Sequence, residues 1–158
     1  MSRDRSKKQI FLSQPDYAKS ILIRFRMENC KSVSTPLESG KQFRKFSDED
    51  RPFDKQLYQQ AIGCLTYFAM STRPDISAAV GALSQFMACP SEEHWVGVKR
   101  ILRYLKGTLD YGLMFSSDGS DQVSDTFYGY SDADWAALFH SASSSVTYIN
   151  SKCFLSFF

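Results

Sequence analysis

Two aspartates separated by a single residue, Asp132 and Asp134, are the strongest candidates for catalytic side chains in this sequence. They follow the β-prone run 126–130, so both are expected at or just after the end of a strand. Such a pair can hold Mg²⁺, but magnesium sites for phosphoryl transfer need further oxygen ligands, usually carboxylates from distant parts of the chain. The alternative is a turn or helix N-cap after the strand, and taken alone the two residues favour that structural role.

A second group that could carry chemistry is a row of basic side chains, Lys99, Arg103 and Lys106. At helical spacing they project within about 60° of one another. A separate apolar stripe on the same segment consists of Val98, Ile101, Leu102 and Leu105. One face would then pack against the protein while the other contacts phosphate groups. The alternative is an ordinary solvated helix face, which is the commoner case for a single Lys/Arg-rich helix.

Other reactive residues give less support for catalysis. His94 and His140 have no Cys or Asp at ligand-like spacing, so a zinc site is not expected. The sequence has no Gly-rich phosphate loop, no G-x-S-x-G and no Cys with an assignable His partner. The string 100–103 matches the R-x-L-R tag of secreted oomycete effectors, but it lies in the middle of the chain without a preceding signal peptide. We interpret it as chance helix composition.

Composition is that of a water-soluble globular protein. The 158 residues have a formal charge of +2, four widely spaced cysteines and no apolar run of the ~20 residues that a membrane helix requires. We expect an intracellular chain, cytoplasmic or nuclear, with free thiols, no signal peptide and no membrane association. Thirteen Phe and eight Tyr exceed what a small core needs, which suggests self-association or a partner surface.

The first half of the chain predicts a strand, two helices and a long connection. Residues 1–8 are charged and expected to be disordered, and a β-prone run at 9–12 ends before Pro15, which suits a first helical turn. Apolar residues then recur at helical spacing over 15–27 and again over 55–70. Between these helices the periodicity disappears, which predicts a long exposed loop.

The second half predicts two further helices followed by strands. A helix beginning at Pro74 closes at Cys89-Pro90, and another runs from an N-cap at Ser91 to Gly107. The pattern then changes to period two at 111–115 and 126–130, which predicts an antiparallel hairpin. We therefore predict an α+β fold with an N-terminal strand and helix, a central three-helix bundle and a C-terminal hairpin, followed by a poorly ordered tail over 137–158.

Several of these segments, in this order, resemble copia-type retrotransposon Pol polyproteins. The matches begin with Ile10-Phe11-Leu12-Ser13-Gln14. The strongest are Thr72-Arg73-Pro74-Asp75-Ile76, Pro90 with His94-Trp95, Lys99–Thr108 and Gly129–Ala136. The resemblance implies a thumb or connection region of reverse transcriptase over 9–108, the start of a ribonuclease H domain over 109–136, and a divergent tail over 137–158. The central helices would be the thumb-like bundle.

The resemblance also implies roles for the candidate residues. Asp132 matches the first metal-binding aspartate of ribonuclease H, Asp134 is its neighbour, and the row from Lys99 to Lys106 would contact the backbone of an RNA–DNA or DNA duplex. The intact family enzyme uses Mg²⁺, but no cofactor is expected here. The aspartate pair of the polymerase site would lie upstream of Gln9, and the later ribonuclease H carboxylates are absent after Ala136.

These points favour a catalytically inactive, truncated fragment that retains at most weak duplex binding. An alternative from another class is a recruited protein-interaction module, effector-like or regulatory, which uses exposed aromatic side chains. A third hypothesis is that the sequence is a short piece of an intact polyprotein. A Tyr-Val-Asp-Asp hairpin encoded in the upstream genomic frame would identify that case.

Overall fold

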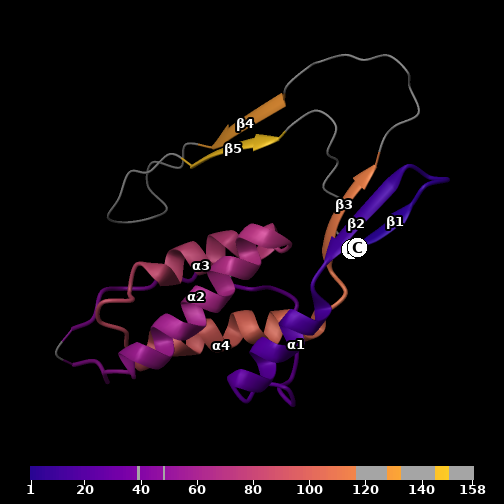
Figure 1. Cartoon of the computed structure of the whole chain (residues 1–158). Coiled ribbons are helices and arrows are strands. Elements are labelled where there is room, and N and C mark those ends of the chain that lie inside the picture. The colour runs from indigo at the N-terminus through magenta and orange to yellow at the C-terminus, as the bar shows by residue number, and fades with distance from the viewer. Residues whose placement is uncertain (39, 48, 117–127, 133–144, 150–158) are drawn as a thin grey trace. The chain divides into compact units, whose positions relative to one another are not determined.

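The computed structural model describes residues 1–38, 40–47, 49–116, 128–132 and 145–149 (Figure 1). The chain divides into two units, one formed by Ser13–Gly112 and the other by the N-terminal residues up to Leu12 together with those from Leu113 onward. The first contains the helices, and the regular structure described in the second consists of strands. Among the described residues, no helix combines the length and the apolar character that crossing a membrane requires.

The helical unit contains four α-helices and one short 3-10 helix (Figure 1). Their bounds are α1 Pro15–Arg24, α2 Lys55–Ser71, η1 Pro74–Ile76, α3 Ser77–Ser84 and α4 Glu92–Gly107. All four predicted helices are therefore confirmed. The first ends three residues earlier than expected, and the third begins as a 3-10 turn after Pro74.

Local sequence signals explain where these helices begin. Pro15 occupies the first turn of α1, where its missing N–H leaves no intrahelical bond unmade. Asp54 caps α2, because its carboxylate accepts from the backbone N–H groups of Gln56 and Leu57 at 2.9 and 3.1 Å. Ser91 caps α4 as predicted.

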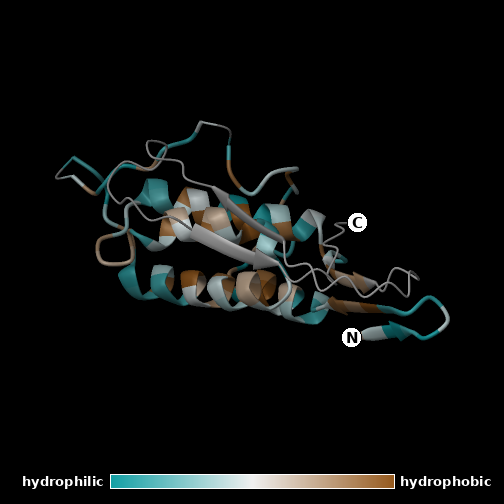
Figure 2. Ribbon diagram, turned by 90° about the horizontal axis from the view of Figure 1, so that it is seen from above, coloured by the Kyte–Doolittle hydropathy of each residue, from teal (hydrophilic) through white to brown (hydrophobic). Residues whose placement is uncertain are grey.

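All four helices contribute to one hydrophobic core, so α1 is part of the bundle rather than an addition to it. Figure 2 shows brown apolar residues along the helices, interrupted by teal polar residues. The fully buried side chains of the core include Ala18, Ile21, Leu22, Tyr58, Ile62, Leu65, Phe68, Ile76, Leu83, Val98, Ile101, Leu102 and Leu105. Tyr58 also joins α2 to α3, because its hydroxyl donates to the carbonyl of Leu83 at 2.8 Å.

The connection between α1 and α2, residues 25–54, is irregular in backbone and mostly exposed over 30–52, as the sequence predicted, but several of its side chains also pack against the core. We call it the α1–α2 segment. Val33, Leu37 and Phe43 are partly buried against the core. At its end, Phe53 N–H donates to the Pro90 carbonyl, and Glu92 N–H donates to the Arg51 carbonyl, both at 3.0 Å. Widely spaced apolar anchors hold this segment, and they leave no periodic signal.

The strand unit begins with a hairpin, so the expectation of a disordered start is wrong. Strand β1, Ser2–Asp4, pairs antiparallel with β2, Gln9–Ser13, with Arg3 opposite Ile10. Strand β3, Gly112–Ser116, lies next to β2 in the order β1-β2-β3. The high charge of 1–8 suggested disorder, but backbone pairing with the β-prone run at 9–13 orders part of this segment as a strand.

A second, two-stranded sheet lies nearer the C-terminus. Strand β4, Tyr128–Asp132, pairs antiparallel with β5, Ser145–Ile149, and Tyr130 lies opposite Thr147. The α+β class is confirmed, but the predicted hairpin between 111–115 and 126–130 is wrong, because β3 lies next to β2 and β4 pairs with β5. A strand also occupies part of the segment expected to be a poorly ordered tail. The remainder of 137–158 lies outside the described residues.

Candidate nucleic-acid interface

The predicted basic row lies on α4, and all three of its side chains are partly buried. Arg103 already has a structural role, because its Nε donates to the backbone carbonyl of Lys31 at 2.8 Å. Within the described part of the chain, Lys99, Arg103 and Lys106 form no ion pair with a carboxylate. No carboxylate of the described residues therefore neutralises the row, and Arg103 joins it to the connection between α1 and α2.

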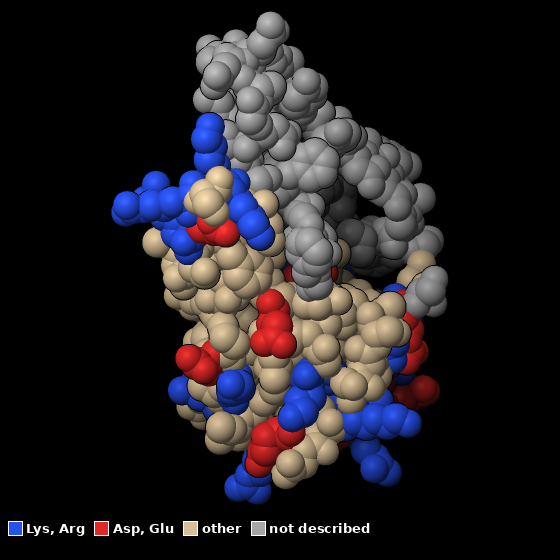
Figure 3. All heavy atoms as spheres, turned by 90° about the vertical axis from the view of Figure 1, so that its right-hand side faces the viewer, with Lys and Arg blue, Asp and Glu red and all other residues tan. Residues whose placement is uncertain are grey.

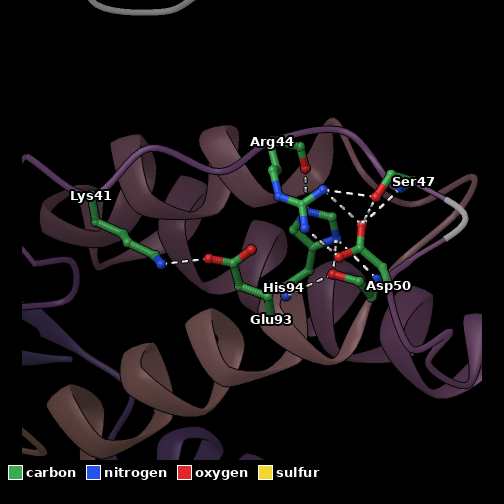
Figure 4. A network of polar contacts seen from close by, with 7 residues as sticks. Lys41, Arg44, Ser47, Asp50, Glu93 and His94 are labelled. Atoms are coloured by element: carbon green, nitrogen blue, oxygen red, sulfur yellow. Dashed lines mark hydrogen bonds and ion pairs between the residues drawn. The ribbon is translucent and has the colours of Figure 1, made fainter.

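Several polar contacts hold the α1–α2 segment against α4. Arg100 binds Glu38 at 2.7 Å and the hydroxyl of Thr35 at 3.0 Å. Lys41 pairs with Glu93 near the start of the helix (Figure 4). The string 100–103 is thus an ordinary part of α4. Its two arginines, Arg100 and Arg103, bind the α1–α2 segment. The two residues between them, Ile101 and Leu102, are 0% exposed.

His94 connects the start of α4 to the α1–α2 segment, and Figure 4 shows the surrounding network. Its Nδ1 accepts from the backbone N–H of Ser91 at 3.0 Å, so its Nε2 carries the proton and donates to the Arg44 carbonyl at 2.9 Å. The ring stacks on Phe86, with centroids 4.0 Å apart and planes inclined by 10°. These contacts suit a neutral imidazole.

A carboxylate organises the next turn of the segment. Asp50 accepts from the backbone N–H of Ser47 at 2.8 Å and pairs with Arg44 at 2.6 Å (Figure 4). The bond from Ser47 is the main reason that the pKa of Asp50 lies below its usual value, with Arg44 contributing. Asp50 therefore stays ionised and fixes the carbonyl of Arg44 near His94.

We expect the protein to lose stability as the pH falls below 6.5. Burial lowers the pKa of His94 below its ordinary value of 6.5, against smaller opposing effects of Arg44 O, Glu93 and Asp50. The unfolded chain then takes up a proton before the folded chain does, so the stability supplied by the neutral ring is present above the ordinary pKa and declines as the pH falls below it. Urea unfolding between about pH 5 and pH 8 measures this change.

The variant His94→Gln provides the control for this pH dependence. An amide oxygen and N–H₂ group can replace the accepting and donating atoms without titrating. The variant should therefore show a smaller change in unfolding free energy over the same range. An equal change in wild type and variant would show that His94 is not its source.

Arg73 is the centre of a second buried polar cluster, which sequence reasoning did not identify. Arg73 is 1% exposed and pairs with Asp75 through Nε at 2.9 Å and NH2 at 2.7 Å. Its two terminal nitrogens also donate to the carbonyl and hydroxyl of Thr108 at 2.8 and 2.6 Å. Tyr104 donates to Asp75 at 2.8 Å, and burial together with that carboxylate raises the pKa of Tyr104 to about 12.

This cluster gives a structural reason for two of the motifs noted in the sequence. The 72–76 motif supplies the arginine and aspartate, and the end of the 99–108 motif supplies their partner Thr108. Arg73 also lies over the rings of Phe68 and Tyr111, 5.8 and 5.4 Å from their centroids. The motifs therefore fasten the α2–α3 turn to the C-terminal end of α4.

The structure describes only one of the two candidate metal ligands, Asp132 and Asp134. Asp132 is the last residue of β4 and lies opposite Ser145, while Asp134 lies outside the described residues. In the ranges that the structure describes, no group of three or more His, Cys, Asp or Glu side chains could hold a metal ion. The assignment of Asp132 as an inherited metal-ligand position, with Asp134 as its neighbour, stays a prediction.

The β1–β2 hairpin carries a second basic group, which we call the hairpin cations: Arg3, Arg5, Lys7 and Lys8. All are exposed, and Figure 3 shows blue side chains gathered where the hairpin faces the viewer. Asp4 orders the turn by accepting from Ser6 N–H at 2.9 Å and Lys7 N–H at 3.2 Å, and the Ser6 hydroxyl is the main cause of its lowered pKa. In the sequence, the hairpin cations could have been recognised from the high density of charged residues in 1–8.

Comparison with known proteins gives the context of these motifs. The "Retrovirus-related Pol polyprotein from transposon TNT 1-94" of Nicotiana tabacum is 41% identical over 152 residues, which is 93% of this chain. The corresponding polyprotein from transposon RE2 of Arabidopsis thaliana is 39% identical over 127 residues, or 80% of the chain. This chain is homologous to a segment of copia-type retrotransposon Pol polyproteins.

The homologous segment is a small part of those proteins. The match covers 11% of the tobacco polyprotein and 8% of the Arabidopsis one, so the chain spans about a tenth of the length of these curated relatives. "Secreted RxLR effector protein 161" of Plasmopara viticola is 46% identical over 92 residues, which is 58% of this chain and 62% of that protein. No family model and no solved structure matches the chain.

Proposed function

We propose that these 158 residues act as a non-catalytic, duplex-gripping segment derived from the reverse-transcriptase thumb and the adjoining start of ribonuclease H. Homology to Pol polyproteins over 93% of the chain carries this proposal. The partner would be an RNA–DNA or DNA duplex, contacted through its phosphates and without sequence readout. Binding of this kind is electrostatic, so we expect it to be weak at physiological salt.

Two basic groups support phosphate binding, one in each unit. The α4 row provides Lys99, Arg103 and Lys106, of which Arg103 uses only its Nε in the contact with Lys31 that the structure describes. The hairpin cations add exposed charges held in an ordered turn. A formal charge of only +2 for the whole chain means that such local groups, rather than net charge, must provide the attraction.

A binding experiment with an RNA–DNA hybrid tests this function. Fluorescence anisotropy should show an affinity that falls steeply between about 50 and 200 mM salt, because each phosphate contact releases counterions. The double variant Lys99→Ala/Lys106→Ala should reduce the slope of log K against log salt by about two, if each side chain neutralises one phosphate. Arg103 is left intact because it also holds the α1–α2 segment.

The matched control is Lys19→Ala/Lys55→Ala, which removes the same charge from α1 and α2. Lys19 and Lys55 are exposed, and neither belongs to a proposed contact group. An equal loss of slope in this control would contradict the assignment to α4. Absence of binding at about 50 mM salt would contradict duplex binding itself.

The proposed lack of catalysis rests on whether the carboxylates of the chain gather into a metal site. Of the residues that the structure describes, no three or more His, Cys, Asp or Glu side chains come together in a group that could hold a metal ion. Metal-assisted phosphoryl transfer by two ions needs several carboxylates in one place. Asp132 would then be an inherited metal-ligand position without a complete site.

A second candidate function is a protein-interaction module. It is favoured by apolar side chains that remain exposed on the helical unit: Met70 is 84%, Ile23 63% and Tyr67 53% exposed. Tyr67 and Met70 lie one turn apart on α2 and so share a face. Sizing the purified chain tests this, because self-association that Met70→Glu abolishes would support the module, whereas a monomer at all concentrations would count against it.

A further inference from the structure

A pocket of about 360 Å³ lies between the α1–α2 segment and α4. Leu37 and Phe43 of the segment and Val96 and Gly97 of the helix form its apolar wall. Its volume is at the lower end of the roughly 300–1,000 Å³ typical of small-molecule sites. The pocket can therefore enclose a compact organic molecule or an aromatic ring.

Charge in the wall of the pocket is predominantly positive. Lys41, Lys99, Arg100 and Arg103 line it together with two carboxylates, those of Glu38 and Glu93. Glu93 is paired with Lys41 and Glu38 with Arg100. Among the described residues Lys99 and Arg103 have no carboxylate partner, so the pocket holds two uncompensated positive charges that would attract an anion.

One donor in the wall is left without an acceptor. Arg100 binds Glu38 and Thr35 through its two terminal nitrogens, but its Nε is buried and has no hydrogen-bond partner. Among the described residues, it is the only buried side-chain nitrogen or oxygen atom in this condition. Because this atom is shielded from solvent, a ligand could reach it only if the Arg100 side chain shifted, so Lys99 and Arg103 are the groups that would meet an anion directly.

We propose that this pocket binds a small aromatic anion, an aryl phosphate or aryl sulfonate. Its ring packs against Leu37, Phe43 and Val96, and its anionic oxygens lie beside Lys99 and Arg103. Aromatic and aliphatic walls with a few convergent donors are the usual composition of such sites. This proposal does not depend on duplex binding, since its ligand is a single molecule and Lys106 has no part in it.

Naphthalene-2-sulfonate is a suitable probe because it combines a ring with one anionic group. Titrated into the full chain, it should shift the amide NMR signals of Val96 and Gly97 in a saturable way, with one molecule bound per chain. Inorganic sulfate alone and neutral 2-naphthalenemethanol should each bind at least about fivefold more weakly. Equal binding of the neutral compound, or no saturable shift, would overturn the proposal.

Substitutions locate the site independently. Val96 is 56% exposed, so Val96→Trp places an indole ring at the pocket without disturbing the core and should weaken binding about tenfold. Lys99→Gln should weaken it about fivefold, and Lys99→Arg should restore it. Met70→Trp and Lys55→Gln are matched controls on α2 that should leave binding unchanged. Similar losses in variants and controls would place the probe elsewhere and overturn the assignment.

Discussion

Replacing Arg73 with leucine should lower the free energy of unfolding by about 3–5 kcal/mol, because it leaves a largely buried carboxylate without its partner. The side chain of Asp75 is 11% exposed and would keep only the hydroxyl of Tyr104 as a donor among the contacts described. Thr108 would also lose both of its bonds from the guanidinium. Urea unfolding followed by circular dichroism measures the change.

Arg44→Leu is the matched control for this prediction. Arg44 also pairs with an aspartate, at 2.6 Å, but its own side chain is 59% exposed. Asp50, although only 13% exposed, would keep the N–H and hydroxyl of Ser47 as donors, so we expect a loss of about 1 kcal/mol or less. A second variant separates charge from packing: Arg73→Met/Asp75→Leu removes both partners and should recover part of the loss. If Arg73→Leu lowered the free energy of unfolding no more than Arg44→Leu, the Arg73 cluster would not be the main attachment of the α2–α3 turn to α4.

The elements that the sequence predicted well are those specified by local signals. Pro15 and Ser91 begin their helices through properties of their own side chains and nearest neighbours. The apolar period of α4 likewise places Ile101, Leu102 and Leu105 in the core as expected. Such signals act over one or two helical turns, so sequence inspection is sufficient to read them.

The features that were missed depend on partners far away in the sequence. Arg73 meets Thr108 across 35 residues, and His94 meets Arg44 across 50. A run without periodicity, such as 30–52, predicts only the absence of regular structure; it does not show that spaced apolar residues pack on the core or that polar contacts join the run to α4. The strand at 112–116 was recognised by its alternation, which does not specify which other strand it will join.

The candidate site likewise combines a feature that local sequence predicted with a contact between distant residues that it did not. The basic row on α4 was predicted from spacing alone, whereas the contact between Arg103 and Lys31 joins residues 72 positions apart. Arg103 therefore has two roles, since it holds the α1–α2 segment and also offers charge. This is why Lys99 and Lys106, rather than Arg103, are the informative substitutions for binding.

Gly97→Val should destabilise the helical unit by roughly 1–3 kcal/mol, although a glycine inside a helix is normally a weak point. A Cβ atom at Gly97 would lie 2.8 Å from Phe43 Cζ and 2.9 Å from Leu83 Cδ2, well inside normal contact distance. Phe43 would have to leave its place against α4, and the α1–α2 segment would move with it. The unfolding free energy in urea gives the magnitude.

Two other glycines of the same bundle are the controls, and they should respond in the opposite direction. A Cβ atom added at Gly63 in α2 or at Gly81 in α3 would have no neighbouring atom within 4 Å, so an alanine methyl group meets nothing there. Gly63→Ala and Gly81→Ala should each stabilise the protein by about 0.5–1 kcal/mol through helix propensity. If Gly97→Val did not lower the free energy of unfolding, Phe43 would not pack as closely against α4 as described. The assignment of Phe43 to the wall of the pocket would then be wrong as well.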